Sequence, residues 1–132
     1  MVSLFSCFSI KEINGGIVGI QIDDPGSSAT FLQNFIDSPA IHSQGSTGVQ
    51  VGTSEAATGH IYGNQWRLNI ASKNAGLNVW GNNDSYHLSI SGGATFGIGF
   101  NVSSANNEVF ISLNNAVTPV VDSSTCQCNK IY

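Results

Sequence analysis

The feature that most constrains the fold of this chain is a period-two alternation of apolar and polar side chains in five successive short runs. In a β-strand, alternate side chains point to opposite faces, so each run has one face for a core and one for solvent. The pattern predicts five strands, with apolar residues at Trp66, Leu68 and Ile70; Leu77 and Val79; Tyr86, Leu88 and Ile90; Phe96, Ile98, Phe100 and Val102; and Val109, Ile111 and Leu113.

Turn-forming residues separate these runs at intervals of roughly 8–12 residues, a rhythm typical of sandwiches and barrels. Examples are Asn14-Gly15-Gly16, Asp24-Pro25-Gly26, Gly63-Asn64, Gly81-Asn82-Asn83-Asp84 and Asn106-Asn107. No composition shift marks a domain boundary and no internal repeat is visible. The sequence therefore predicts one all-β domain over residues 1–132, an antiparallel β-sandwich of the jelly-roll kind.

The alternation also predicts which residues form the core. These are Trp66, Leu68, Ile70, Leu88, Ile90, Phe96, Ile98, Phe100, Val109, Ile111 and Leu113. In the first half, residues 17–22 and 49–51 are expected to be strands. Residues 27–37 fit either a helix or a buried strand, and we favour the strand because the rest of the chain is β.

Charge excludes two classes of partner. Charged residues make up 9% of the chain, and the formal net charge is −4. Lys11, Arg67, Lys73 and Lys130 form no basic patch in the sequence, and a basic patch is what nucleic acids and anionic membranes require. No apolar stretch has the length of a membrane span, and the N-terminus lacks the features of a signal peptide. We expect a protein that is cytoplasmic, or secreted without a signal peptide, and that inserts into no membrane.

Three cysteines, Cys7, Cys126 and Cys128, leave at least one thiol without an intramolecular partner. The sequence allows reduced thiols, a bridge from Cys7 to the C-terminal pair, or an intermolecular disulfide. The spacing of Cys126 and Cys128 is too short for common zinc sites, so no metal or other cofactor is expected.

Signatures of catalysis are also missing from the sequence. No Gly-x-Ser-x-Gly motif occurs, and the three histidines have no acidic residue at a telling spacing. Most carboxylates fall in predicted turns, where Asp commonly caps the backbone. We therefore expect no catalytic residues and a protein that is not an enzyme.

The polar faces of three successive predicted strands carry the candidate ligand site. A large aromatic side chain on such a face is either covered by a second layer or available to stack on a ligand. Sugars suit this setting, because they have apolar faces that stack on Trp and hydroxyls that pair with amides and guanidinium groups. A glycan site is hypothesised at Arg67, Asn69, Asn78, Trp80 and His87; the alternative is ordinary sheet surface.

Two stretches, residues 66–73 and 76–82, resemble the central strands of galectins, the fungal ones especially. The later segments 96–100 and 108–114 are similar to the closing strands of that sandwich. The resemblance implies a galectin-like lectin, in which Asn69 stands where the galactose-contacting His usually lies and Lys73 replaces an Arg. It covers about half of the chain.

A second hypothesis comes from the same composition. Low charge and abundant Asn, Ser and Gly also suit a self-assembling structural protein of a capsid, fibre or crystalline inclusion, which buries uncharged surfaces against its own copies. Under either hypothesis we expect a homo-oligomer. A small pore-forming sandwich is a third possibility, which lacks the expected basic or aromatic membrane patch.

Overall fold

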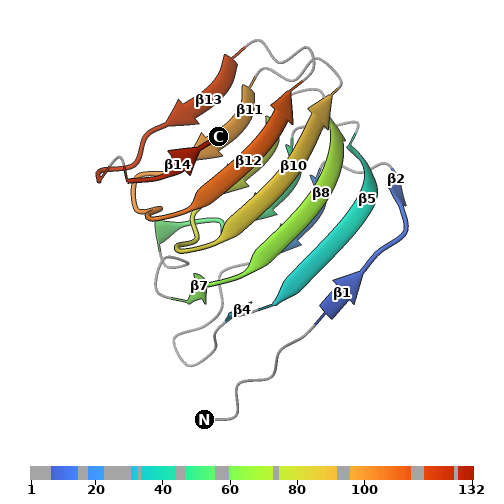
Figure 1. Cartoon of the computed structure of the whole chain (residues 1–132), viewed down its shortest axis with the longest axis horizontal. Coiled ribbons are helices and arrows are strands. Elements are labelled where there is room, and N and C mark those ends of the chain that lie inside the picture. The colour runs from blue at the N-terminus through green and yellow to red at the C-terminus, as the bar shows by residue number, and fades with distance from the viewer. Residues whose placement is uncertain are drawn as a thin grey trace.

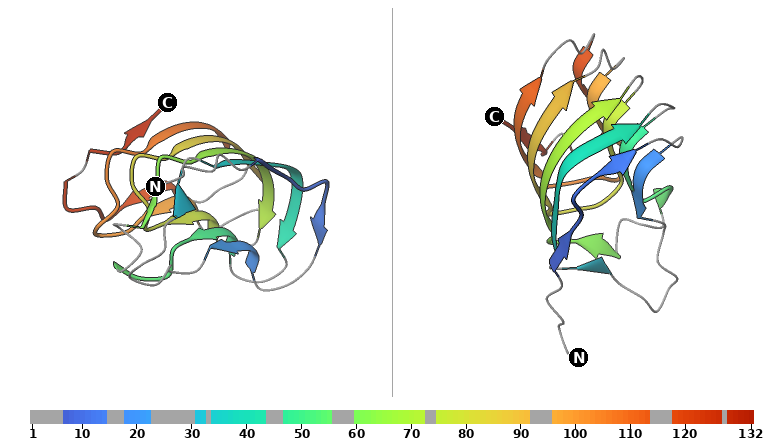
Figure 2. Two further views of the ribbon diagram at one scale, coloured as in Figure 1. Left: turned by 90° about the horizontal axis from the view of Figure 1, so that it is seen from below. Right: turned by 90° about the vertical axis from the view of Figure 1, so that its right-hand side faces the viewer.

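The computed structural model describes residues 7–14, 18–22, 31–32, 34–43, 47–55, 60–72, 75–91, 96–113, 118–126 and 128–132. These residues form three sheets (Figures 1 and 2). The seven-stranded sheet contains β1 (Cys7–Ser9), β2 (Ile13–Asn14), β5 (Phe35–Ser43), β8 (Gln65–Ser72), β10 (Ser85–Ser91), β12 (Glu108–Leu113) and β14 (Lys130–Ile131). The five-stranded sheet contains β3 (Val18–Ile22), β6 (Thr47–Val51), β9 (Ala75–Val79), β11 (Phe96–Phe100) and β13 (Thr118–Asp122). A short sheet pairs β4 (Phe31–Leu32) with β7 (Ile61–Tyr62).

Every described strand pairing is parallel, so the predicted antiparallel β-sandwich is wrong. The chain winds as a solenoid: each coil adds a strand to the seven-stranded sheet, then one to the five-stranded sheet, and returns. Strands β5, β8, β10 and β12 consequently lie side by side in chain order (Figure 1). Local alternation is the same in parallel and antiparallel strands, so it predicted the strands without their direction.

The coils are not of equal length. Aligned positions in the seven-stranded sheet are 35, 65, 85, 108 and 130, which are 30, 20, 23 and 22 residues apart. The coils therefore repeat in the structure at unequal spacings, and no fixed period of the kind that marks a solenoid is present in the sequence.

The core lies between the two large sheets, because both contribute inward-facing residues to one cluster. Among the predicted core residues, Trp66, Leu68, Ile70, Leu88, Ile90, Ile98, Phe100 and Val109 are buried, and the prediction is confirmed for them. Ile111 is half-buried and packs against the cluster. The side chains of Phe96 and Leu113 lie outside the described residues.

The strands expected at residues 17–22 and 49–51 are present as Val18–Ile22 and Thr47–Val51, and residue 17 lies outside the described residues. Within the ambiguous segment, residues 31–32 and 35–37 are strand, which confirms the favoured alternative for them; residues 27–30 and 33 lie outside the described residues. Within the described ranges, no helix has the length and apolar character needed to cross a membrane.

A column of glycines brings the coils into close contact. A Cβ atom built on Gly76 would lie 2.5 Å from the carbonyl oxygen of Gly97 and 2.5 Å from Cδ1 of Ile90. Gly19 and Gly48 occupy the equivalent register positions and are crowded in the same way by Ile41 and Ile70. Only glycine fits where each coil packs on the isoleucine of the neighbouring sheet.

The corner that leads into the seven-stranded sheet repeats in successive coils. Gly63, Asn83 and Asn106 adopt positive φ values of 70°, 54° and 56°, a conformation that Gly and Asn tolerate best. The next residue in each coil is Asn64, Asp84 or Asn107. The turn signals at Gly63-Asn64, Asn83-Asp84 and Asn106-Asn107 were therefore correctly located, and each marks the same corner of successive coils. Residues 15–16 and 24–26 lie outside the described residues, and Asn14 is part of β2.

Together with Asn34 and Asn129, these three residues form a ladder, which we call the corner ladder: Asn34, Asn64, Asp84, Asn107 and Asn129. The first four are buried, and Asn129 is half-buried. The backbone N–H and the side-chain amide of Asn34 both donate to Oδ1 of Asn64, each at 3.0 Å. Asn64 donates in the same way to Oδ1 of Asp84 at 2.7 and 3.2 Å, and Asn107 to Oδ1 of Asn129 at 3.1 and 3.0 Å. The ladder thus satisfies polar groups that the turn of each coil would otherwise bury unpaired.

Candidate functional site

The residues of the hypothesised glycan site do not form one surface. Arg67 and Asn69 on β8 and His87 on β10 are exposed on the outer face of the seven-stranded sheet. Asn78 lies on β9 in the other large sheet, where it donates to Gln50 at 3.0 Å and accepts from Asn101 at 2.8 Å. Trp80 follows β9 and packs partly buried against the core. The site was expected on three neighbouring strands, but β8 and β10 pair directly and β9 belongs to the opposite sheet.

The outer face of the seven-stranded sheet carries a continuous line of side chains, which we call the outer column: Asp37, Arg67, His87, Phe110 and Tyr132. Strand register aligns the first four. Tyr132 extends the line by stacking on Phe110 at 4.8 Å between ring centroids, and Phe110 in turn stacks on His87 at 4.7 Å. Beside this line, Asn69, Ser89 and Ser112 form a second aligned and exposed row.

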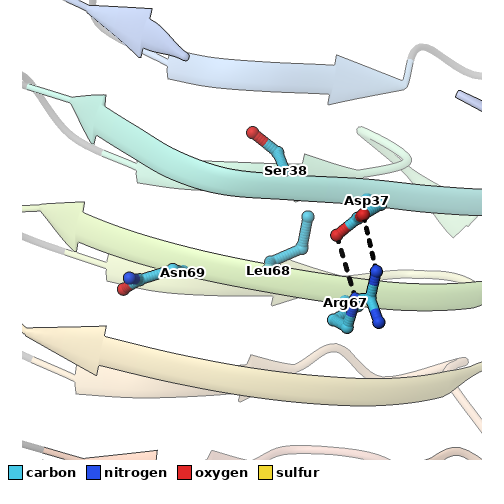
Figure 3. A pocket seen from close by; sticks show the side chains of 5 residues that line it. All are labelled: Asp37, Ser38, Arg67, Leu68 and Asn69. Carbon is cyan, nitrogen blue, oxygen red and sulfur yellow. Dashed lines mark hydrogen bonds and ion pairs between the residues drawn. The ribbon is translucent and has the colours of Figure 1, made fainter. Parts of the chain in front are cut away.

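Asp37 and Arg67 form an ion pair with two contacts (Figure 3). The Nε atom of Arg67 donates to Oδ1 of Asp37 at 3.0 Å, and Nη2 donates to Oδ2 at 2.7 Å. This hydrogen bonding lowers the pKa of the Asp37 carboxyl below its usual 3.8. The guanidinium carbon also lies 5.6 Å from the ring centre of Phe35, a cation–π contact. Two neighbours therefore hold the guanidinium in place.

An open pocket of about 210 Å³ lies at this pair, lined by Asp37, Ser38, Arg67, Leu68 and Asn69 (Figure 3). The register between β5 and β8 shifts between Ser38 and Ile41, an irregularity of the kind that redirects side chains at a sheet surface. The hydroxyl of Ser38 is buried and has no hydrogen-bond partner in the structure. The pocket thus joins a carboxylate, a guanidinium and an amide, with the buried residues Ser38 and Leu68 beneath them.

Asp37 and Ser38 were absent from the predicted site, yet the sequence holds a signal for Asp37. It lies three residues after Asn34, just as Arg67, His87, Phe110 and Tyr132 lie three residues after the later members of the corner ladder. Aligning the coils by that ladder would have placed all five side chains in one column. No sequence signal marks Ser38.

Asp84 is the most strongly perturbed carboxyl among the described residues. Burial raises its pKa from 3.8 to about 6, against the opposing effect of hydrogen bonds from Asn64, Tyr86 and Trp66. Its Oδ2 accepts from Trp66 Nε1 at 3.2 Å and from the Tyr86 hydroxyl at 3.0 Å, and burial raises the pKa of that hydroxyl well above 10. A perturbed carboxyl often marks catalysis, but both oxygens of Asp84 are already engaged within the core. Its role is structural.

The cysteines pair differently from the three arrangements expected for them. Cys126 is joined to Cys128, and Cys7 is a free, exposed thiol. No group of three or more His, Cys, Asp or Glu side chains that could hold a metal ion occurs among the described residues. Comparisons with protein-family models, with curated proteins and with solved structures find no match for this chain.

Proposed function

We propose that the protein binds carbohydrate, without catalysis, at the pocket of Asp37, Arg67 and Asn69. The observation that carries this proposal is the ion pair held at the pocket. A guanidinium has five N–H donors, and Asp37 takes donors on only two of the three nitrogens. The remaining donors, the carboxylate lone pairs and the Asn69 amide can pair with sugar hydroxyls, which both donate and accept.

The surroundings of the pocket suit a chain of sugars. Asn69, Ser89 and Ser112 offer uncharged hydrogen-bonding groups on neighbouring parallel strands, which lie about 4.8 Å apart. Phe110 is stacked between the rings of His87 and Tyr132, so stacking on a sugar is left to the outer faces of His87 and of Tyr132, which is 62% exposed. Binding at the pocket is therefore expected to depend on hydrogen bonding more than on stacking.

The pocket is less suited to glycoside hydrolysis. That reaction generally uses two carboxyl groups on opposite sides of the scissile bond. The residues that line the pocket include a single carboxylate, Asp37. Its pKa is lowered by Arg67, whereas a general acid needs a raised pKa. These two features support binding without turnover.

A glycan array compares wild type with two matched amide variants, Asn69→Ala in the pocket and Asn78→Ala on the opposite sheet. Binding by wild type and by Asn78→Ala, with loss in Asn69→Ala, is the expected result. A thermal melt of each variant confirms that it is folded. The proposal is wrong if wild type binds no glycan, or if folded Asn69→Ala binds as well as wild type.

Self-assembly is a second candidate, favoured by the distribution of exposed apolar side chains. Val102, Phe110, Val121, Ile131 and Tyr132 are all exposed and belong to the last described coils. Strands β13 and β14 are the final strands of their sheets, so within the described residues one edge of each has no paired strand. Parallel edges at both ends of a solenoid allow a second copy to continue the sheets head to tail.

Light scattering after size-exclusion chromatography tests this candidate. Oligomers whose mass increases with concentration are expected for wild type. Val121→Lys should shift them toward the monomer, whereas Asn69→Lys, on the outer face of an interior strand, should not. A wild type that stays monomeric at high concentration contradicts the assembly model and leaves the carbohydrate proposal untouched.

A further inference from the structure

The disulfide Cys126–Cys128 lies in the segment between β13 and β14, outside the glycan pocket. The two cysteines are two positions apart in the sequence. Cys126 is exposed and Cys128 is half-buried. A reagent from solution can therefore reach the bond in the folded protein, which is the first requirement for disulfide exchange.

The bond is not needed to hold this segment in place. The Thr125 backbone N–H and hydroxyl both donate to the carbonyl of Val102 at 2.9 Å. The side chain of Asn129 accepts from Asn107 as the end of the corner ladder, and Lys130 N–H donates to the carbonyl of Asn107 at 2.8 Å. Hydrogen bonds thus fix the chain on both sides of the disulfide. In addition, a crosslink that closes so short a loop restricts the unfolded chain very little.

The environment distinguishes the two sulfur atoms. Cys128 lines a pocket of about 70 Å³ together with Asn106, Asn107, Glu108 and Lys130. The backbone N–H of Cys128 lies 3.3 Å from Sγ of Cys126 and donates to it. Because a hydrogen-bond donor stabilises a thiolate, Cys126 is the better leaving group. Cys128 lines the small pocket and Cys126 does not, so a thiolate that enters the pocket approaches Cys128.

Two charged residues at this pocket act in opposite directions. The Lys130 ammonium pairs with the Glu108 carboxylate at 3.4 Å, and both side chains are substantially exposed. Lys130 attracts an incoming thiolate, and Glu108 repels it. Removing the charge of Lys130 should therefore slow the attack, and removing the charge of Glu108 should accelerate it.

We propose that Cys126–Cys128 is a thiol–disulfide exchange site that reacts with dithiols. The thiolate of the dithiol attacks Sγ of Cys128, a mixed disulfide forms, and Cys126 leaves as a thiolate that takes up a proton. The second thiol of the dithiol then attacks the sulfur of the mixed disulfide that came from the dithiol. Cys128 leaves as a thiolate and takes up a proton. Two electrons pass from the dithiol, which becomes a cyclic disulfide, to the protein, which becomes a dithiol.

The test uses the full chain with Cys7→Ser, so that only this pair reacts. The folded protein is exposed to dithiothreitol, and the rate at which Cys126 and Cys128 become alkylatable is followed by mass spectrometry. The expected result is reduction of the folded protein at a rate within about tenfold of that in denaturant. The reduced protein should keep its circular dichroism spectrum and melt cooperatively. Resistance to reduction until the protein unfolds, or unfolding on reduction, would show a structural crosslink and overturn the proposal.

Charge variants test the role of the pocket. Lys130→Gln should slow reduction, Glu108→Gln should accelerate it, and Lys11→Gln, on the segment between β1 and β2, should leave the rate unchanged. A parallel reaction with glutathione, a monothiol, should place glutathione on Cys128. Equal rates in all three variants, or glutathione found on Cys126 alone, would contradict the proposed direction of attack.

Discussion

The corner ladder and the outer column run along the same solenoid, but they differ in burial and in how much their residue types vary. The corner ladder is buried, except at its half-buried last residue Asn129, and nearly uniform, with Asn at every position except Asp84. The outer column is exposed except at half-buried Asp37, and its chemistry changes along its length, from the ion pair of Asp37 and Arg67 to the stacked rings of Phe110 and its neighbours.

The difference follows from the cost of an unpaired polar group in each place. Inside the corner, the backbone N–H of one coil needs an acceptor on the next, and a buried donor without one costs about 1–3 kcal/mol. An Asn or Asp side chain supplies that acceptor, and few other residues can. On the outer face, water substitutes for any lost partner, so the chemistry can vary. The corner ladder is therefore expected to contribute more to stability than the outer column, and binding is expected at the outer column.

Asn107→Ala should have the largest effect among the changes considered. Its Oδ1 accepts from the N–H of Asp84, and its Nδ2 donates to the carbonyl of Gly81 at 3.0 Å. Leaving those two buried groups unpaired should lower the free energy of unfolding by roughly 2–6 kcal/mol. Urea unfolding measures this loss of stability, and Asn69→Ala, at an exposed position beside the outer column, is the matched control. Equal losses in both variants would remove the distinction between the two lines.

Asp84, the one residue of the corner ladder that is not Asn, predicts how stability depends on pH. The pKa of Asp84 is raised from 3.8 to about 6 in the folded protein, so between these values the folded state binds a proton that the unfolded state lacks. Stability therefore rises as the pH falls from 7 toward 4, by at most about 3 kcal/mol. The lowered pKa of Asp37 has the opposite effect on stability, which is lost as the pH falls, but only near and below 3.8.

Urea unfolding at pH 7 and pH 4.5 measures this effect. Wild type should be more stable at the lower pH, and Asp84→Asn, which has no proton to bind, should lose most of that difference. If wild type and Asp84→Asn show the same pH dependence, another group is responsible, and the carboxyl is not perturbed as its burial implies.

Phe110→Ala interrupts the stacked part of the outer column. It removes the contacts with His87 and Tyr132, but the side chain is partly exposed and lies outside the core. Stacked aromatic pairs contribute about 0.5–1.5 kcal/mol beyond their buried area, so a loss of roughly 1–2 kcal/mol is expected by the same urea assay. A loss as large as that of Asn107→Ala would mean that the column is part of the core.

Arg67→Gln should change stability least. Exposed ion pairs contribute little, because water and salt screen them, and the Arg67 side chain is 65% exposed. The melting temperature is expected to stay close to that of wild type, while carbohydrate binding is lost. A large drop in melting temperature would place Arg67 with the stabilising residues of the ladder.

The strands, their buried faces and the turns could be predicted from the sequence, because they depend on residues that are close together along the chain. The alternation around Leu68 and Leu88 correctly predicted strands and their buried faces, since side chains alternate in any strand. The turn residues Gly63 and Asn106 were correctly recognised, because their backbone conformation is a local property. The exposed positions of Arg67, Asn69 and His87 followed from the same alternation.

The direction of strand pairing and the grouping of the site residues depend on which strands become neighbours in space. Alternation does not distinguish a hairpin from a coil, so the direction of pairing, and with it the separation of Asn78 from Arg67, came only from the tertiary structure. The 20- to 30-residue recurrence of the corner residues was present in the sequence, but unequal coil lengths concealed it. The sequence by itself determined the strands, their corners and their inner faces. Only the winding of the coils brought Asp37 to Arg67, because the physical contact between them is made across thirty residues of chain.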